Sequence, residues 1–115
     1  MKFNRILALA AHTDDIELGN PVNEFRKSMD MVGANTTFMG LKPRIMNEQR
    51  QIILDKLWNL NNDVKYDLVL CPSSADMHQD HQVIYNECFR AFKTTTIFGY
   101  EMVWNTRSFR TDIFV

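Results

Sequence analysis

Short apolar runs alternate along this chain with segments in which apolar side chains recur at helical spacing. The apolar runs predict four strands, over residues 3–11, 35–39, 66–71 and 94–100. The segments of helical spacing predict three helices, over residues 21–32, 47–60 and 79–92. Strands that alternate with helices indicate a parallel sheet with helices on its faces.

Two of the predicted helices have a clear apolar face. The residues expected to face the core are Ile52, Ile53, Leu57 and Leu60 in the second helix, and Val83, Ile84, Cys88 and Ala91 in the third. Gly33 is expected to end the first helix, and the polar residues 61–63 to end the second. Residues 104–115 show no clear period and are expected to be mostly irregular.

Length and composition narrow the class of protein. The 115 residues indicate one domain, spanning residues 1–115. A hydrophobic fraction of 45% and an aromatic fraction of 11% favour a globular domain over a disordered one. The formal charge is −1, with acids and bases mixed along the chain, so no charged patch indicates nucleic acid or an anionic membrane surface as a partner.

The chain is expected to be cytoplasmic. Its N-terminal apolar run is short, and no run approaches the length of a membrane span, so neither a signal peptide nor a membrane helix is expected. Cys71 and Cys88 have neither the spacing of a metal motif nor the density of a disulfide scaffold. Both are therefore expected to be reduced thiols.

Two segments carry the candidate chemistry, and each follows a predicted strand. Residues 12–15 (HTDD) follow the first strand, and residues 76–81 (DMHQDH) follow the third. The second segment holds two of the chain's 3 histidines. Because ligands bind beyond the carboxyl ends of strands in open α/β sheets, both segments are expected at the same edge of the sheet.

The residue types in these segments suit a metal-dependent hydrolase. Zinc accepts imidazole nitrogen and carboxylate oxygen, and catalytic zinc sites use three protein ligands plus a water. His12, Asp15 and His81 can supply such a set, and bound Zn²⁺ would lower the pKa of its water to about 7. Another divalent metal such as Fe²⁺ fits the same ligand types.

Three further residues can serve the reaction itself. Asp14, adjacent to Asp15, can take the proton of the water. His78 can act as the general acid or, when protonated, as the group that stabilises the oxyanion. Asp80 can hold the tautomer of His78 through a hydrogen bond.

Simpler structural roles are open for each residue taken alone. Asp14 and Asp15 can cap the N-terminus of a helix, where carboxylates are favoured, and Asp80 can cap the helix that follows it. His81 alone is typical of a surface residue in a first helical turn, and Glu17 of a solvated loop. The pairing of the two segments, more than any single residue, favours a metal site.

The two segments also resemble the signatures of a known enzyme family. Residues 11–19 (AHTDDIELG) look like the AHPDD(E/I)ELG signature of the PIG-L/LmbE-like zinc de-N-acetylases, and residues 78–81 (HQDH) resemble their HxDH signature. Residues 98–101 (FGYE), followed by Trp104, Asn105 and Phe109, are similar to the strand and loop after that helix. These enzymes remove acetyl groups from N-acetylglucosamine conjugates or related N-acyl sugars.

The resemblance implies a fold, a partner and a set of roles. The fold is a Rossmann-like three-layer α/β/α domain with a mainly parallel sheet, here reduced in size. The partner is a small N-acetylated sugar conjugate, whose aglycone the sequence does not define. The site residues that it implies are the zinc ligands His12, Asp15 and His81, the general base Asp14, and His78 as the general acid or oxyanion group with Asp80 behind it.

Several departures from the family bear on activity. Thr13 replaces the usual proline, and after Gly19 the chain runs almost directly into residues 21–25, which look like the family's next helix. A helix and a strand of the family thus have no counterpart, and family members continue beyond Val115. An uncovered sheet face predicts a homo-oligomer or poor solubility. An inactive or weakly active remnant, serving as a metal-binding or interaction module, is the alternative function.

Two other classes fit less well. A phosphoacceptor receiver domain also has an acidic pair after its first strand, but it needs an Asp at the end of the third strand and a Lys at the end of a later one. Cys71 and Pro72 stand at the first of these places, and Lys93 precedes the fourth strand. A two-metal phosphoesterase needs more bridging ligands than this chain offers.

Overall fold

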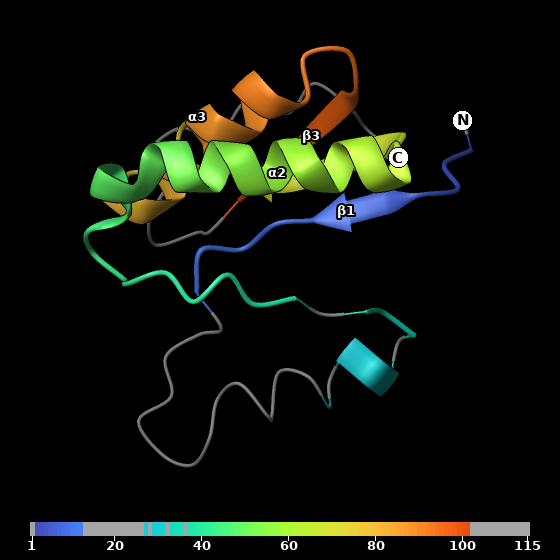
Figure 1. Ribbon diagram of the computed structural model, residues 1–115, viewed down its shortest axis with the longest axis horizontal. Coiled ribbons are helices and arrows are strands. Elements are labelled where there is room, and N and C mark those ends of the chain that lie inside the picture. Colours follow the sequence, from blue (N-terminus) through green and yellow to red (C-terminus); the bar gives the residue numbers. More distant parts are fainter. Residues whose placement is uncertain (1, 13–26, 28, 32, 36, 102–115) are drawn as a thin grey trace.

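The structure is a computed structural model that describes residues 2–12, 27, 29–31, 33–35 and 37–101. Helices alternate with strands from residue 46 to residue 100, which is the α/β pattern that the sequence predicts. The elements in chain order are β1 (Ile6–Ala8), the 3-10 helix η1 (Met46–Gln49), α2 (Arg50–Val64), β2 (Leu68–Pro72), α3 (Gln79–Ala91) and β3 (Thr96–Tyr100) (Figure 1).

The three strands of the described residues form a parallel sheet in the order β1-β2-β3. Leu68 at the start of β2 lies opposite Ile6 in β1 and Thr96 in β3, so β2 is the central strand. The helices α2 and α3 pack side by side, and α3 also packs on β2 (Figure 1). The finer Rossmann-like layering on two faces of the sheet stays a prediction.

The hydrophobic core lies where the two helices meet the central strand. The predicted apolar face of α3 is confirmed, because all four of its residues are buried. Valine and isoleucine side chains such as Val83 and Ile84 each contribute roughly 1.5–3 kcal/mol when they are fully buried. Cys71 and Cys88 lie inside as free thiols. The buried core residues are Met46, Ile53, Leu57, Val69, Cys71, Val83, Ile84, Cys88, Ala91 and Phe92.

The face of α2 is only partly as predicted. Ile53 and Leu57 are buried and Leu60 is partly buried against the core, but Ile52 is 50% exposed. Successive residues of an α-helix point about 100° apart, so a core centred on Ile53 and Leu57 turns the Ile52 side chain toward solvent. The assignment of Ile52 to the core face was wrong.

The end of α2 also differs from the prediction. The helix continues to Val64, through the polar residues 61–63 that were expected to end it. Lys65 then takes a left-handed conformation with φ of 60°, and its N–H donates to the Asn61 carbonyl. A left-handed residue in this place ends a helix, although glycine is the usual occupant.

The described residues of the N-terminal part hold less regular structure than predicted. β1 is shorter than the predicted strand over residues 3–11, and no described residue of 35–39 belongs to a strand. A sequence prone to extended structure forms a strand only where a neighbouring strand pairs with it. Gly33 has φ of +75° two positions after the helical residue Met31, as expected of a glycine near the end of a helix. The predicted helical residues 21–26 and the tail 104–115 lie outside the described residues.

Among the described residues, no helix has both the length and the apolar character needed to cross a membrane.

Candidate functional site

The two segments that carry the candidate chemistry come together at one edge of the sheet, through His12 of the first and residues 76–81 of the second. His12 follows the carboxyl end of β1, and its Nε2 lies 2.8 Å from Oδ2 of Asp80, a residue 68 positions away in the sequence. Asp80 lies in the first turn of α3, beyond the carboxyl end of β2. The expectation that both segments lie at the carboxyl ends of the strands is therefore confirmed for His12 and for residues 76–81.

All three histidines of the chain gather here. The ring centroids of His78 and His81 lie 4.6 Å apart in a stacked arrangement, with 18° between the ring planes. The His12 ring centroid lies 5.0 Å from that of His78 and 5.6 Å from that of His81. Three imidazoles at these distances, with two nearby carboxylates, form a dense set of nitrogen and oxygen donors.

The loop between β2 and α3 brings two of these rings into place. Asp76 is 1% exposed, and its backbone N–H donates to the Ser73 carbonyl. Ser73 in turn donates its backbone N–H to the Tyr100 carbonyl at the end of β3. Gly99 faces the same point, because a Cβ there would lie 3.1 Å from the Ser73 Cα. The end of β3 therefore sets the position of the loop that carries Asp76.

Asp76 holds both histidines of its segment. Its Oδ2 lies 2.7 Å from Nδ1 of His81, and its Oδ1 accepts the backbone N–H of His78 at 2.8 Å. His78 is the N-cap of α3, and its ring Nδ1 accepts the backbone N–H of Asp80 at 3.1 Å. No role was predicted for Asp76, although its place in the six-residue segment 76–81 was a signal.

The Asp80 carboxylate contacts a different histidine from the one expected. Its Oδ2 bonds to His12 and also accepts the Arg44 backbone N–H at 2.6 Å, while the bond between Asp80 and the His78 ring comes from the Asp80 backbone. The expected carboxylate contact with His78 is thus replaced by one with His12. The other oxygen, Oδ1, is buried and has no hydrogen-bond partner among the described residues.

Arg44 connects the loop before η1 to this cluster through its backbone. Its φ is 70°, a left-handed conformation that non-glycine residues adopt infrequently. The conformation is accompanied by two bonds to the first turn of α3. The Arg44 N–H donates to Asp80, and its carbonyl accepts from Nε2 of Gln79 at 2.8 Å.

His12, His78 and Asp80 form a group that could hold a metal ion. One ligand atom from each lies within 4.8 Å of the others. Imidazole nitrogen and carboxylate oxygen suit zinc, iron and other divalent metals. Of the predicted ligands, His81 lies against the other two rings. The predicted ligand Asp15 and the predicted base Asp14 lie outside the described residues.

The local charges shift two pKa values in this cluster. Burial lowers the pKa of His78, and the neighbouring His81 and His12 lower it further, against the opposite effect of Asp80 and Asp76. Burial by itself raises the pKa of Asp80, but the Arg44 amide and the His12 ring outweigh it and hold the pKa below its usual value. His78 is thereby favoured as a neutral ring, and Asp80 as a carboxylate.

The side chain of Tyr100, in the edge strand β3, forms a hydrogen bond with the segment that follows the other edge strand, β1. Tyr100 donates its hydroxyl hydrogen to the Leu9 carbonyl at 2.6 Å, shortly before His12. Burial, with the nearby Cys71 and Asp76, raises the pKa of Tyr100 to about 12. The hydroxyl therefore remains a donor at neutral pH, and it helps to fix where the chain leaves β1. From the sequence, Tyr100 belonged to a predicted strand and to the resembling residues 98–101, but this hydrogen bond was not predicted.

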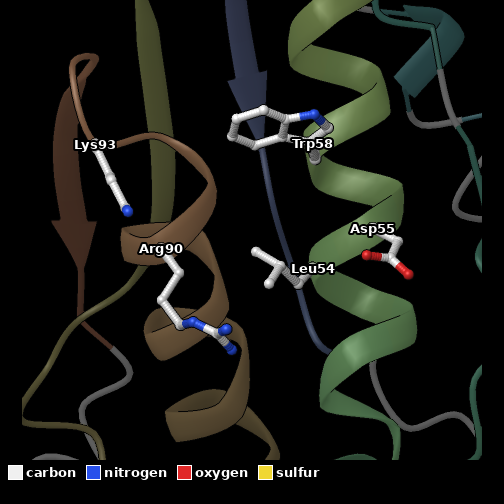
Figure 2. Close-up of a pocket in the computed structure, with 5 residues that line it drawn as sticks. All are labelled: Leu54, Asp55, Trp58, Arg90 and Lys93. Carbon is white, nitrogen blue, oxygen red and sulfur yellow. The ribbon is translucent and has the colours of Figure 1, made fainter.

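A surface cavity of about 360 Å³ lies elsewhere, between α2 and the end of α3 (Figure 2). It contains none of the three histidines. The side chains that line it are Leu54, Asp55, Trp58, Arg90 and Lys93.

In comparisons with known protein families, curated proteins and solved structures, this chain matches none. The resemblance of its two segments to the de-N-acetylase signatures thus rests on their own residues.

Proposed function

We propose that this protein is a metal-dependent hydrolase that removes the acetyl group from an N-acetylglucosamine conjugate or a related N-acyl sugar. The observation that carries the proposal is the meeting of His12 with the segment of His78 and His81 at the carboxyl edge of the sheet. These are the residues that the signatures would bring together. A purely structural cluster has no need of three imidazoles at the place where α/β domains bind ligands.

The residues fit a bound metal. Oδ1 of Asp80 is a buried carboxylate oxygen without a partner among the described residues, and such groups are rare unless an ion or water satisfies them. We assign the zinc ligands as His12, Asp15 and His81, following the resemblance. The group of described residues that could hold a metal, His12, His78 and Asp80, shares only His12 with this set. When bound, Zn²⁺ supplies a Lewis acid and lowers the pKa of a water molecule to about 7.

The protein residues would divide the proton transfers between them. Asp14 takes the proton of the attacking water, because it is adjacent to a ligand without being one. The Nδ1 atom of His78 accepts a backbone N–H, so a neutral His78 ring carries its own proton on Nε2. Through this Nε2–H, a neutral His78 can donate a hydrogen bond to the oxyanion. To protonate the amide nitrogen as the C–N bond breaks, His78 must first become an imidazolium, whose Nδ1 no longer accepts the Asp80 N–H.

The alternative function is a metal-binding or interaction module without turnover. The departures of the sequence from the family favour it, because a helix and a strand of the family have no counterpart here. The two functions agree on metal binding and differ on catalysis.

The test begins with the zinc content of the purified chain, measured by elemental analysis before and after chelation. We expect about one equivalent per chain, lost on chelation and regained with added zinc. Acetate release from a panel of N-acetylglucosamine conjugates then separates the two functions. The variant Asp14→Asn should keep its zinc and lose about 100-fold or more in turnover.

A chain that neither holds nor regains zinc would contradict both functions. Bound zinc without acetate release would favour the alternative module. Near-normal turnover in Asp14→Asn would remove Asp14 from the role of base.

A further inference from the structure

We infer that Asp76 is a positioning residue, which gives His81 and His78 opposite hydrogen-bonding roles at the metal site. The inference rests on the proposed function, because it concerns the same site. Asp76 is the one residue that bonds to both of them through its side chain among the described hydrogen bonds, with Oδ2 at His81 Nδ1 and Oδ1 at the His78 backbone. Its side chain is fully buried.

The first step concerns His81. A carboxylate can only accept hydrogen bonds, so the 2.7 Å contact requires the proton of the His81 ring to lie on Nδ1. In a neutral imidazole the other nitrogen, Nε2, then has a free lone pair. Histidines that bind metals commonly donate their second N–H to a carboxylate in this way. Asp76 therefore prepares His81 to act as a ligand through Nε2.

The second step concerns His78, whose ring is stacked on His81. Its Nδ1 accepts the Asp80 backbone N–H, so the proton of the neutral ring lies on Nε2. This arrangement depends on His78 being the N-cap of α3 with an extended backbone, at φ −71° and ψ 127°. The other oxygen of Asp76 holds the His78 backbone N–H in that conformation.

Two stacked rings thus present different atoms, a lone pair on His81 and an N–H on His78. A hydrolase needs both at one site, because the metal requires an acceptor and the reacting amide requires a donor. The same carboxylate fixes both arrangements. An asparagine at position 76 could not, because its amide has one acceptor oxygen and one donor nitrogen where two N–H groups must be accepted.

The experiment uses the full chain and the variant Asp76→Asn. Long-range ¹H–¹⁵N NMR spectra of the metal-free protein report which nitrogen of each ring carries the proton. We expect Nδ1–H for His81 and Nε2–H for His78 in the wild type. Competition with a chromophoric chelator measures the affinity for Zn²⁺ and Co²⁺, and we expect Asp76→Asn to lower it about 10–100-fold.

The matched control is Ser73→Ala. It removes a hydrogen bond from the same loop, the one that the Ala75 N–H donates to the Ser73 hydroxyl. It leaves the contacts of Asp76 with both histidines in place. We expect Ser73→Ala to preserve both tautomers and the metal affinity, which distinguishes the role of Asp76 from a general loosening of the loop.

The outcomes separate this inference from the proposed function. Wild-type His81 with its proton on Nε2 would overturn the inference without any variant, even if Asp76→Asn failed to fold. Unchanged tautomers and metal affinity in a folded Asp76→Asn would overturn it while the proposed function stood. A wild-type chain that binds neither metal would overturn the proposed function, and the tautomers would still decide the role of Asp76.

Discussion

Helix α3 has one buried carboxylate in its first turn and another in its second half, and the two differ in the groups that bind them. In the second half of the helix, Glu87 is fully buried and bonds to Arg50 Nε at 2.7 Å and to Arg90. In the first turn, Asp80 is equally buried but bonds to His12 and to a backbone amide. Arginine is always charged at physiological pH, whereas the charge of histidine is conditional.

The difference separates a structural ion pair from a site. Each oxygen of Glu87 accepts a hydrogen bond from a guanidinium group, so two permanent positive charges balance its negative charge. Asp80 leaves Oδ1 without a partner among the described residues, and its partner His12 is charged only when it is protonated. Burial of a carboxylate is therefore a weak guide to function by itself. It is more informative to know which side chain pairs with the carboxylate, and whether one of its oxygens lacks a hydrogen bond.

The largest effect is expected in the first turn of α3, where the histidines lie, and it concerns the affinity for Zn²⁺. His81→Ala removes a proposed ligand and should lower the affinity for Zn²⁺ by more than about 100-fold, since even residues behind the ligands change it about 10–100-fold. His78→Ala is the matched control, because it removes a stacked ring of the same kind that we assign as a donor. It should keep the metal and lose turnover. Chelator competition measures the Zn²⁺ affinity of both variants, and acetate release measures their turnover. Loss of metal in His78→Ala but not in His81→Ala would favour His12, His78 and Asp80 as the ligands.

The second largest effect is expected at Glu87, which bonds to two arginines, and it concerns the free energy of unfolding. Glu87→Gln replaces charge-assisted hydrogen bonds by weaker ones and should lower the free energy of unfolding by about 2 kcal/mol, measured by urea denaturation. The affinity for Zn²⁺ should not change. Glu48→Gln, at an exposed position of η1, is the control and should stay within about 0.5 kcal/mol of the wild type. A loss of metal affinity in Glu87→Gln would show that the two ends of α3 are coupled.

The smallest effect is expected at a third carboxylate, Asp67, which is partly exposed to solvent. Asp67 accepts the backbone N–H groups of Asn4 and Arg5, at 3.1 and 3.0 Å. These bonds, that of Asn4 first, lower the pKa of Asp67 in the folded state. Its contribution to stability is therefore present above the ordinary pKa of the group and is lost as pH falls through the lowered value.

Urea midpoints of the wild type and Asp67→Asn should accordingly differ at neutral pH and converge as the pH falls below 3.8, the ordinary pKa of the group, and through its lowered pKa. A difference that persisted unchanged into that range would mean that the two hydrogen bonds act without the charge.

The sequence was most informative where local signals and tertiary packing agree. α3 runs from Gln79 to Ala91, close to the prediction, because its apolar face and its polar first turn point to the same helix. The polar residues 61–63 misled for the opposite reason, because their turn propensity was overridden by a helix that packs on α3. The predicted strand at residues 35–39 failed because extended propensity cannot reveal whether a pairing strand exists.

The candidate site, too, was partly predictable from the sequence and partly not. The meeting of the two segments followed from the rule that parallel strands end at one edge, so His12 and residues 76–81 could be predicted to lie together. The partners of each carboxylate could not, because they depend on distances of a few ångströms. Asp80 reaches His12 instead of the His78 ring, and Asp76 takes the position that supports His81.

The strand order has a consequence for the time course of folding. β2, α3 and β3 follow one another in the sequence, so this unit can form through local contacts, whereas His12 and Asp80 are 68 positions apart. Closing a longer loop costs more entropy, and proteins rich in distant contacts fold more slowly. The two halves of the site should therefore be joined late. In pulsed hydrogen exchange, the Leu9 amide, which donates to Leu70 at 2.8 Å, should gain protection after the amides that pair β2 with β3.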